Sequence, residues 1–257
     1  MKYGFIGCGN MGSAIAGALA SANVDLAVSD RSGKAKDSGF AYCSPREVAQ
    51  QADRIFLAVK PQMMADVLAE LSPILARRRP VLISMAAGLT MSRIAAMAGG
   101  NYPVIRIMPN TPVAVGCGMT LYCANELVTK EVLDDFLKDM APTGRMDKLE
   151  ERLFDAAGTV SGCGPAYVYM FIEAMAEGAV ACGVPRAKAM EYAAAAIAGA
   201  GMFALKSGQH PGALKDAVCS PGGSTIAGVK ALEDGKFRGT VMDCIMAATK
   251  RNSELGK

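Results

Sequence analysis

Residues 2–12 read KYGFIGCGNMG, a short apolar segment that runs into three glycines spaced Gly-x-Gly-x-x-Gly. The segment at 2–7 predicts a β-strand, and a helical pattern follows to about residue 22. Between a strand and a helix, Gly7 permits a tight turn, Gly9 lets the backbone approach a pyrophosphate, and Gly12 lets the helix pack on the strand. The stretch therefore predicts a dinucleotide-binding loop, whose cofactor contacts we assign to Gly7, Cys8, Gly9, Asn10, Met11 and Gly12.

Strand and helix patterns alternate from this loop to about residue 150. Ser44 and Glu47 have the spacing of a capping box at a helix start, and Thr90 is the expected cap of another helix. Such alternation is typical of an α/β domain with a largely parallel, doubly wound sheet. We therefore expect a Rossmann-like domain at residues 1–150, with strands at 2–7, 24–30, 40–43, 54–59, 80–86, 104–108, 119–123 and, at one edge, 144–148.

Further cofactor contacts are expected at strand ends, because doubly wound sheets bind ligands at the carboxyl ends of their strands. Lys60 follows one buried strand; it is either an ordinary solvated lysine or, as its place favours, a contact to the cofactor. Residues 110–112 are expected around the same crevice. The contacts predicted at these strand ends are Ala58, Val59, Lys60, Pro61, Ala86 and Ala87.

The end of the strand at 24–30 should bind the adenosine ribose, and it carries two opposing signals. Asp30 can accept a hydrogen bond from a free 2′-hydroxyl, which suits NAD. Arg31 and Ser32 can hold a 2′-phosphate, since a guanidinium matches phosphate geometry. The alternative is that Asp30 begins a turn and Arg31 lies in solvent. We predict that NADP(H) is preferred and that NAD(H) can also be used.

The second predicted domain, residues 151–257, has a helical pattern throughout. A helix at about 165–182 has one apolar face, whereas a helix at 186–206 is apolar nearly all round from 193 to 205. A helix that is apolar on all sides must be buried on all sides. A C-terminal region of this size cannot surround it, so we expect a homodimer formed through the C-terminal helices.

The sequence CSPGGSTIAG at residues 219–228 is the expected site of substrate binding. A helix entered through two glycines offers free backbone N–H groups and the positive end of the helix dipole, which favour a small anion. The alternative is that Ser220 or Ser224 is simply an N-cap. The predicted substrate contacts in this turn are Ser220, Gly222, Gly223, Ser224 and Thr225.

Composition excludes several classes of function. The formal net charge of the 257 residues is +3, which gives no reason to expect a nucleic-acid partner. Eight cysteines without a Cys-x-x-Cys pair favour reduced thiols over a zinc site, and a single histidine, His210, makes a histidine-based triad or metal cage untenable, so no metal is predicted. Glycines and prolines interrupt the long uncharged runs, and an apolar strand pattern stands where a signal peptide would. We therefore expect a soluble, cytoplasmic protein without a membrane span.

Several motifs along the chain resemble those of the pyrroline-5-carboxylate reductase family. They are FIGCGNMG at 5–12, AVKP at 58–61, AAGLT at 86–90, MPNTP at 108–112, SGCGPAYVY at 161–169 and HPGALKDAVCSPGGSTIAG at 210–228. The resemblance implies an enzyme that uses NAD(P)H to reduce 1-pyrroline-5-carboxylate to L-proline, the last step of proline biosynthesis. It also implies dimers built from intertwined C-terminal helices, which assemble further into decamers in some members.

The resemblance also assigns roles to single residues. Ser220 and the amides of residues 222–225 would hold the substrate carboxylate, the Thr225 hydroxyl would bond the ring nitrogen as the catalytic contact, and Glu151 would touch the substrate. Three residues depart from the usual family pattern. Cys163 and Cys219 replace hydroxyl residues, and Asp30 replaces an asparagine, which puts the NADP preference in question.

Two other classes of function remain open on sequence alone. A β-hydroxyacid-type dehydrogenase or another imine reductase would share the N-terminal fold, but the dehydrogenase needs a lysine on the early C-terminal helix, and residues 165–183 contain none. A non-catalytic NADP(H)-sensing protein would need only the nucleotide fold. The expected anion site at Ser220 and Thr225 argues against a sensor, because a sensor has no use for a second site.

Overall fold

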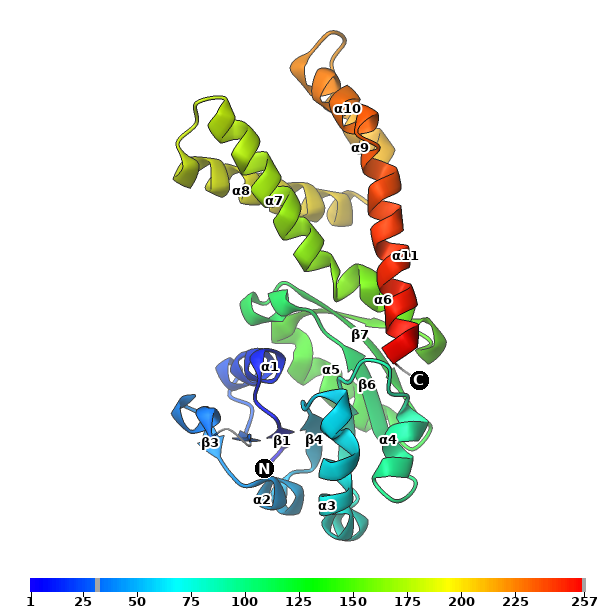
Figure 1. The fold of residues 1–257 in the computed structure, drawn as a ribbon. Helices are drawn as coiled ribbons and strands as arrows, with labels where there is room; N and C mark the ends of the chain where they lie inside the picture. The colour runs from blue at the N-terminus through cyan, green and yellow to red at the C-terminus, as the bar shows by residue number, and fades with distance from the viewer. Residues whose placement is uncertain (31–32, 256–257) are drawn as a thin grey trace. The chain divides into compact units, whose positions relative to one another are not determined.

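The computed structural model describes residues 1–30 and 33–255 of the chain (Figure 1). Its centre is a sheet of eight strands in the order β3-β2-β1-β4-β5-β6-β7-β8. All neighbouring strands are parallel except β6 and β7, which are antiparallel. The predicted doubly wound, largely parallel sheet is therefore confirmed. The strands are β1 Tyr3–Ile6, β2 Leu26–Ser29, β3 Ala41–Tyr42, β4 Arg54–Leu57, β5 Val81–Ser84, β6 Val104–Met108, β7 Gly118–Ala124 and β8 Gly144–Lys148.

The helices begin where the sequence provides caps. Ser44 and Glu47 make the predicted capping box, and the hydroxyls of Thr90 and Thr129 accept from the backbone N–H three residues on. His210 caps α9 through its side chain, which accepts from the Gly212 N–H. The helices are α1 Asn10–Ser21, α2 Pro45–Gln51, α3 Met64–Arg78, α4 Met91–Met97, α5 Lys130–Met140, α6 Phe154–Ser161, α7 Gly164–Ala181, α8 Arg186–Ser207, α9 Pro211–Ala217, α10 Ser224–Asp234 and α11 Phe237–Leu255.

Helices cover both faces of the sheet, which is why its strands are continuous apolar runs rather than alternating ones. Successive residues of one strand enter opposite cores: Ile55 and Leu57 pack with α2, α3 and α4, whereas Phe56 packs with α1 and α5. Phe56 stacks on Phe5 with ring centroids 4.4 Å apart. Two separate cores thus hold the strand ends that line the site in fixed positions.

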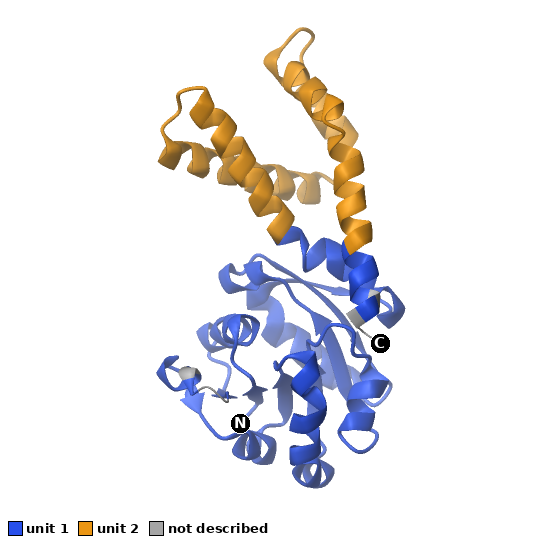
Figure 2. Ribbon diagram, viewed as in Figure 1, with its two compact units in different colours: residues 1–165, 248–257 blue, residues 166–247 orange. Residues whose placement is uncertain are grey.

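The chain divides into two compact units, which are described separately (Figure 2). Unit 1 comprises Met1–Pro165 with Ala248–Lys257, and unit 2 comprises Ala166–Ala247. The predicted division at residue 150 falls where the sheet ends, since β8 stops at Lys148. Compactness groups α6 and the last turns of α11 with the sheet as well.

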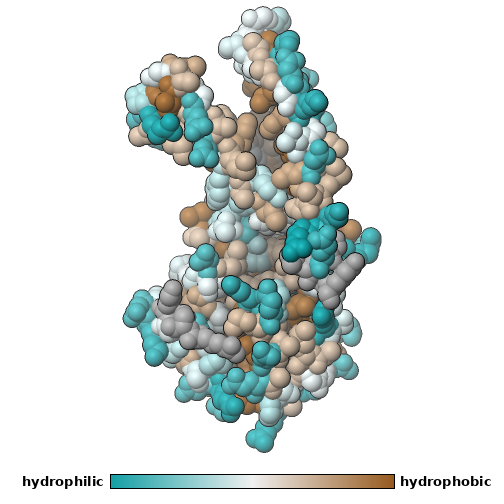
Figure 3. All heavy atoms as spheres, in the orientation of Figure 1, coloured by the Kyte–Doolittle hydropathy of each residue, from teal (hydrophilic) through white to brown (hydrophobic). Residues whose placement is uncertain are grey.

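Unit 2 leaves most of its apolar side chains exposed. Among its described residues, the buried apolar ones are three alanines, Ala176, Ala189 and Ala193. Figure 3 shows apolar residues, in brown and tan, over the surface of these helices. In the described part of the chain, no helix combines the length and apolarity that crossing a membrane requires. The large exposed side chains include Tyr169, Met170, Tyr192, Met202, Phe203, Leu205, Met242 and Met246.

Candidate active site

The glycine loop lies between β1 and α1, and two of its glycines are required by geometry. Gly7 has a φ of 99°, and a Cβ there would lie 2.5 Å from the Ala58 carbonyl oxygen. A Cβ on Gly12 would lie 2.8 Å from the Gly7 carbonyl oxygen. A Cβ on Gly9, by contrast, would meet no described atom within 4 Å. The space beside Gly9 is therefore open, which a closely approaching pyrophosphate would need.

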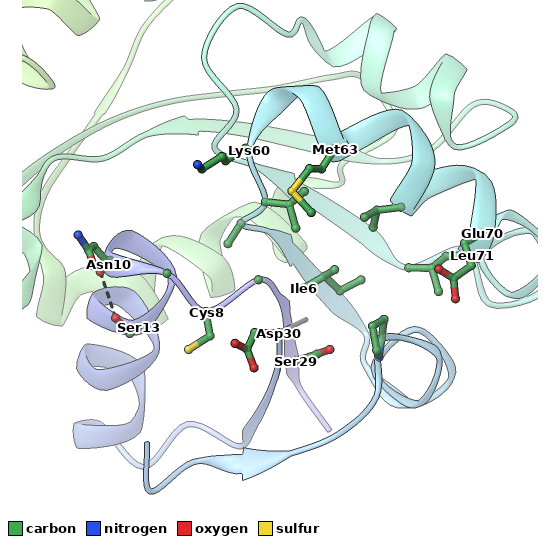
Figure 4. Close-up of a pocket in the computed structure, with 16 residues that line it drawn as sticks. Ile6, Cys8, Asn10, Ser13, Ser29, Asp30, Lys60, Met63, Glu70 and Leu71 are labelled. Carbon is green, nitrogen blue, oxygen red and sulfur yellow. Dashed lines mark hydrogen bonds between the residues drawn. The ribbon is translucent and has the colours of Figure 1, made fainter. Parts of the chain in front are cut away.

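A cavity of about 560 Å³ opens beside this loop, at the carboxyl ends of β1, β2 and β4 (Figure 4). This is the switch point of the sheet, where β1 has β2 on one side and β4 on the other. Such a crevice is the usual ligand site of doubly wound sheets. Of the predicted cofactor contacts, the cavity is lined by Gly7, Cys8, Gly9, Asn10, Ala58, Val59 and Lys60.

A second cavity, of about 300 Å³, adjoins the other side of the same loop. Met11 and Gly12 line it, together with Met85, Met108 and Pro109 at the ends of β5 and β6. The two cavities share Gly9, Asn10, Ala58, Val59 and Lys60. Two hollows that meet at a glycine loop fit a ligand made of two nucleotide halves joined by a pyrophosphate.

The cavity also has walls that no sequence motif predicted. Met63 is the residue directly before α3, Val67 and Leu71 lie on α3, and Pro45 begins α2. The sequence did carry a signal for these wall residues, namely the amphipathic pattern of α3 shortly after Lys60. An apolar helix face next to a nucleotide site can form a wall of that site as well as part of the core. The remaining lining residues are Ile6, Ser13, Ser29, Asp30 and Glu70.

Asp30 follows β2 and faces the cavity beside Cys8 and Ser29 (Figure 4). Its Oδ1 accepts from the Ala35 backbone N–H at 3.3 Å, and its carbonyl accepts from the Tyr42 hydroxyl at 3.0 Å. Burial, and to a lesser degree the Asp30 charge, raise the pKa of the Cys8 thiol. A carboxylate is thus held at the expected place of the adenosine ribose. Arg31 and Ser32, the predicted 2′-phosphate contacts, lie outside the described residues.

Other predicted residues lie apart from these cavities. Pro61 opens the short 3₁₀ turn η2 (Pro61–Met63), and Ala86 is buried after β5; these two and Ala87 are absent from the lining of both cavities. Asn110, expected around the crevice, points elsewhere. Its side chain accepts from the Met119 backbone N–H at 2.9 Å and donates to the Ser161 carbonyl at 2.9 Å, so it joins β7 to α6.

The turn before α10 in unit 2 leaves the start of that helix without a side-chain cap. Gly222 has a φ of 69°, which favours glycine, and a Cβ on Gly223 would lie 2.4 Å from Ser220 Oγ. Gly223 is the N-cap residue and no side chain caps the helix, so the alternative in which Ser220 or Ser224 is the N-cap is wrong. The first amides of α10 therefore lack a side-chain acceptor, and Ser220, Ser224 and Thr225 are exposed.

Glu151 occupies a different environment from that turn, inside unit 1. Its Oε1 accepts from the Met91 backbone N–H at 2.7 Å and from Arg106 Nη1 at 3.3 Å. This carboxylate therefore caps α4 and neutralises a buried arginine.

The fold and the glycine-loop cleft are those of the Rossmann class of dinucleotide-binding proteins. Residues 151–255 match the family model for pyrroline-5-carboxylate reductase dimerisation, and residues 2–88 match NADP oxidoreductase, coenzyme F420-dependent. The chain is 43% identical to pyrroline-5-carboxylate reductase of Escherichia coli K12, over 100% of this chain and 98% of that protein. It is 40% identical to the Glycine max enzyme, over 98% of this chain and 95% of the other.

A solved structure supports the same family. Plasmodium falciparum pyrroline carboxylate reductase with NADP bound superposes with a TM-score of 0.91 at 35% identity, covering 100% of both chains. The chain belongs to the pyrroline-5-carboxylate reductase family. It is an NAD(P)H-dependent oxidoreductase that reduces 1-pyrroline-5-carboxylate to L-proline, as the motifs predicted. The dehydrogenase and sensor alternatives are thereby set aside.

Proposed function

We propose that the turn at residues 219–228 is where this reductase binds its substrate. The observation that carries the proposal is the uncapped start of α10, with Gly222 in a left-handed conformation and Gly223 packed against Ser220 Oγ. A substrate carboxylate would accept from these amides and from the Ser220 hydroxyl, with the positive end of the helix dipole behind them. Ser224 adds a further hydroxyl donor at the helix start.

Thr225 is proposed as the catalytic contact. It lies in the first turn of α10, so its hydroxyl can reach the ring nitrogen of an imine whose carboxylate is held by the same turn. When bound, the nicotinamide cofactor supplies the hydride. A cyclic imine is partly protonated near neutral pH, so the residues around it have to orient it and exclude water rather than deliver a proton strongly. A chain with a single histidine fits a reaction that needs no strong proton donor.

For the cofactor, we propose the glycine loop and Lys60 as the phosphate contacts, with Ala58, Val59, Pro61, Ala86 and Ala87 as neighbouring backbone. Lys60 lines both cavities and is the N-cap residue of η2, so its ammonium can approach either half of the dinucleotide. NADPH is proposed as the preferred cofactor through Arg31 and Ser32, against the opposing charge of Asp30. Besides its contacts with Met91 and Arg106, Glu151 was expected from the family resemblance to touch the substrate, and this role stays a prediction.

A homodimer formed through the unit 2 helices is proposed as the functional assembly. Exposed apolar side chains on α7, α8 and α11 and the match to a dimerisation model support it. The decamer and the cytoplasmic location remain predictions.

Thr225→Val tests the catalytic contact, because valine keeps the shape and β-branching while removing the hydroxyl. Loss of one hydrogen bond to a partly charged group should cost about 1.5–3 kcal/mol of transition-state stabilisation, which lowers kcat/KM roughly ten- to a hundred-fold. Ser220→Ala should act mainly on KM, because the carboxylate is held alike in the ground and transition states. The assay follows oxidation of NADPH and NADH in parallel with pyrroline-5-carboxylate.

Titration of NADPH into each variant is the control, since both residues lie on unit 2 and the glycine loop on unit 1. Cofactor affinity should be unchanged. A Thr225→Val enzyme with wild-type kcat/KM, or one that loses NADPH affinity in equal measure, contradicts the assignment.

A further inference from the structure

The last residues of four parallel strands form a row across the sheet, on the face that α2, α3 and α4 cover. The strand register places Ser29 beside Ile6, Ile6 beside Leu57 and Leu57 beside Ser84. Ile6 and Leu57 belong to the apolar core of that face, whereas the two serines bring hydroxyl groups into it. Both serines are 0% exposed. Since a buried hydroxyl is costly without a hydrogen bond, each serine should have a partner.

The two serines differ in this respect. Ser84 Oγ accepts from the Ala86 backbone N–H at 3.3 Å. Ser29 Oγ, by contrast, has no hydrogen-bond partner among the described residues. Only the backbone of Ser29 is engaged, because its carbonyl accepts from the Gly7 N–H at 2.7 Å and so fixes the start of the glycine loop. The Ser29 hydroxyl is therefore a buried polar group for which the described part of the chain supplies no partner.

Ser29 lines the cavity of about 560 Å³ beside the glycine loop. Successive residues of a strand point to opposite faces of the sheet, so Ser29 and Asp30 line this cavity from different sides. Figure 4 shows the Asp30 carboxylate on the side of Cys8 and the Ser29 hydroxyl on the side of Ile6. An unpartnered hydroxyl in the wall of a cavity is placed to bind a polar group of the ligand that enters it.

The surroundings of this hydroxyl indicate the kind of group that it can bind. Ile6, Val67 and Leu71 belong to the same core as the row of strand ends, and they also line the cavity. Apolar walls with a few polar groups that fix orientation are typical of small-molecule sites. A purine base fits such walls, because its two faces pack on aliphatic side chains while nitrogen donors and acceptors lie on its rim. A serine hydroxyl can serve either kind of nitrogen, since it both donates and accepts.

The place of Asp30 indicates which half of the dinucleotide enters this cavity. Asp30 lines the larger cavity and is absent from the lining of the smaller one. In Rossmann folds, an acidic residue at this place binds the ribose of the adenosine half. The base joined to that ribose would then lie in the same cavity, where Ser29 offers its hydroxyl.

We infer that Ser29 is a further cofactor-binding residue, whose hydroxyl forms a hydrogen bond with the adenine base. This role rests on the proposed cofactor site at the glycine loop. Because NADPH and NADH carry the same base, Ser29 serves both cofactors equally, whereas Asp30 acts on the ratio between them. The hydroxyl lowers the stability of the free enzyme, since it is buried without a partner, and it gains that partner when the cofactor binds.

Unit 1 contains two matched controls. Thr120, on β7, is 0% exposed, and its Oγ1 also has no hydrogen-bond partner among the described residues, but it lines neither cofactor cavity. Thr120→Val and Ser29→Ala each remove a buried hydroxyl without a partner, so both should keep or raise the Tm of the free enzyme. Ser84→Ala removes a bonded hydroxyl and leaves the Ala86 N–H without its acceptor, so it should lower that Tm.

The experiment measures the affinity of wild type and the three variants for NADPH and NADH, together with the Tm of each free enzyme. Two fragments, AMP and ribose 5-phosphate, are tested as inhibitors that compete with NADPH. We expect Ser29→Ala to weaken NADPH, NADH and AMP alike by about three- to tenfold, as for the loss of one neutral hydrogen bond. Ribose 5-phosphate, which lacks the base, should keep its inhibition constant within about twofold. Thr120→Val should bind all four ligands as wild type does.

Three outcomes overturn the inference. The first is wild-type affinity for NADPH and AMP in Ser29→Ala. The second is an equal loss for AMP and ribose 5-phosphate, which would place the contact at the sugar or phosphate. The third is a fall in the Tm of free Ser29→Ala like that of Ser84→Ala, since the hydroxyl would then have its partner within the protein. Wild-type NADPH affinity in Gly9→Ala would instead refute the cofactor site itself, whatever Ser29→Ala does.

Discussion

Unit 1 and unit 2 solve the burial of apolar residues in opposite ways. Unit 1 places Tyr3, Phe5, Phe56, Phe136 and Phe154 at 0% exposure, within cores on both faces of its sheet. Unit 2 buries three alanines among its described residues and leaves Met170 70% and Leu205 61% exposed. A sheet between two helical layers can enclose its own core, whereas a few long helices need another surface to pack against.

This difference indicates which contacts keep the cofactor loop and the proposed substrate turn rigid. The cofactor loop is held by contacts within one chain, such as the close approach of Gly7 to Ala58. Most residues of the proposed substrate turn are exposed in a single copy. We expect its rigidity to come from the surface that covers the neighbouring helices of unit 2. Assembly and catalysis should therefore be linked in unit 2 and separable in unit 1.

The largest effect is expected from a charge on α8. Ala196 and Gly199 are exposed in the single chain, so Ala196→Glu or Gly199→Asp would be harmless in a monomer. At a subunit interface, an unpaired buried charge costs about 3–5 kcal/mol, which should give aggregated or unfolded protein. Ala76→Glu, at an exposed alanine of α3 in unit 1, is the control and should stay folded. A soluble, active monomer by light scattering, in either variant or the wild type, would contradict the proposal that the helices of unit 2 need a partner subunit.

The next largest effect is expected at the glycine loop. A substitution there should change NADPH affinity without changing the oligomeric state. A methyl group at Gly9 meets no described atom, so Gly9→Ala should fold normally. It should still weaken NADPH binding by about 1.4–3 kcal/mol, roughly ten- to a hundred-fold, because the methyl fills the space that a pyrophosphate needs. Gly17→Ala on α1, where the nearest contact to the added carbon is Phe40 Cζ at 4.0 Å, should leave affinity unchanged. Fluorescence titration checks both, and equal affinities in the two variants would contradict the loop assignment.

A smaller effect is expected at Asp30, which lines the cavity where the ribose is proposed to bind. Its charge should repel a 2′-phosphate by about 1 kcal/mol through water. Asp30→Asn should therefore raise the ratio of kcat/KM with NADPH to that with NADH by roughly fivefold. The amide keeps an acceptor for the Ala35 N–H, so the loop should remain in place. A ratio that stays constant or falls would mean that Asp30 does not oppose the 2′-phosphate.

The smallest effect is a pH dependence of unit 1 stability. Burial raises the pKa of Asp135, but hydrogen bonds from Arg54 and Lys2 outweigh it and lower the pKa overall. A lowered folded-state pKa gives stability that is present above the unfolded value of about 3.9 and is lost as the pH falls through the folded value. The Tm difference between wild type and Asp135→Asn should thus be constant above about pH 5 and shrink below about pH 4. A difference that grows on acidification would refute this linkage.

Local patterns predicted much of the fold because each depends on residues close in sequence. The capping box at Ser44 and Glu47, the cap at Thr90 and the β8 edge strand all formed as expected. The glycine loop was predicted for the same reason, since three glycines at fixed spacing, between a strand and a helix, admit few structures. Family motifs then identified the reaction, although they could not decide how Glu151 acts.

The sequence by itself determined the order of strands and helices, the glycine loop, the glycines of the turn at 219–228 and the apolar surface of α8. These follow from short-range sterics and from apolar periodicity, which the chain carries locally. The tertiary structure alone decided which distant groups meet. Met63, Val67 and Leu71 became a cavity wall, Asn110 turned to α6, and Glu151 paired with Arg106, 45 residues away. Such pairings depend on how elements pack across the sheet, and no spacing along one segment encodes them.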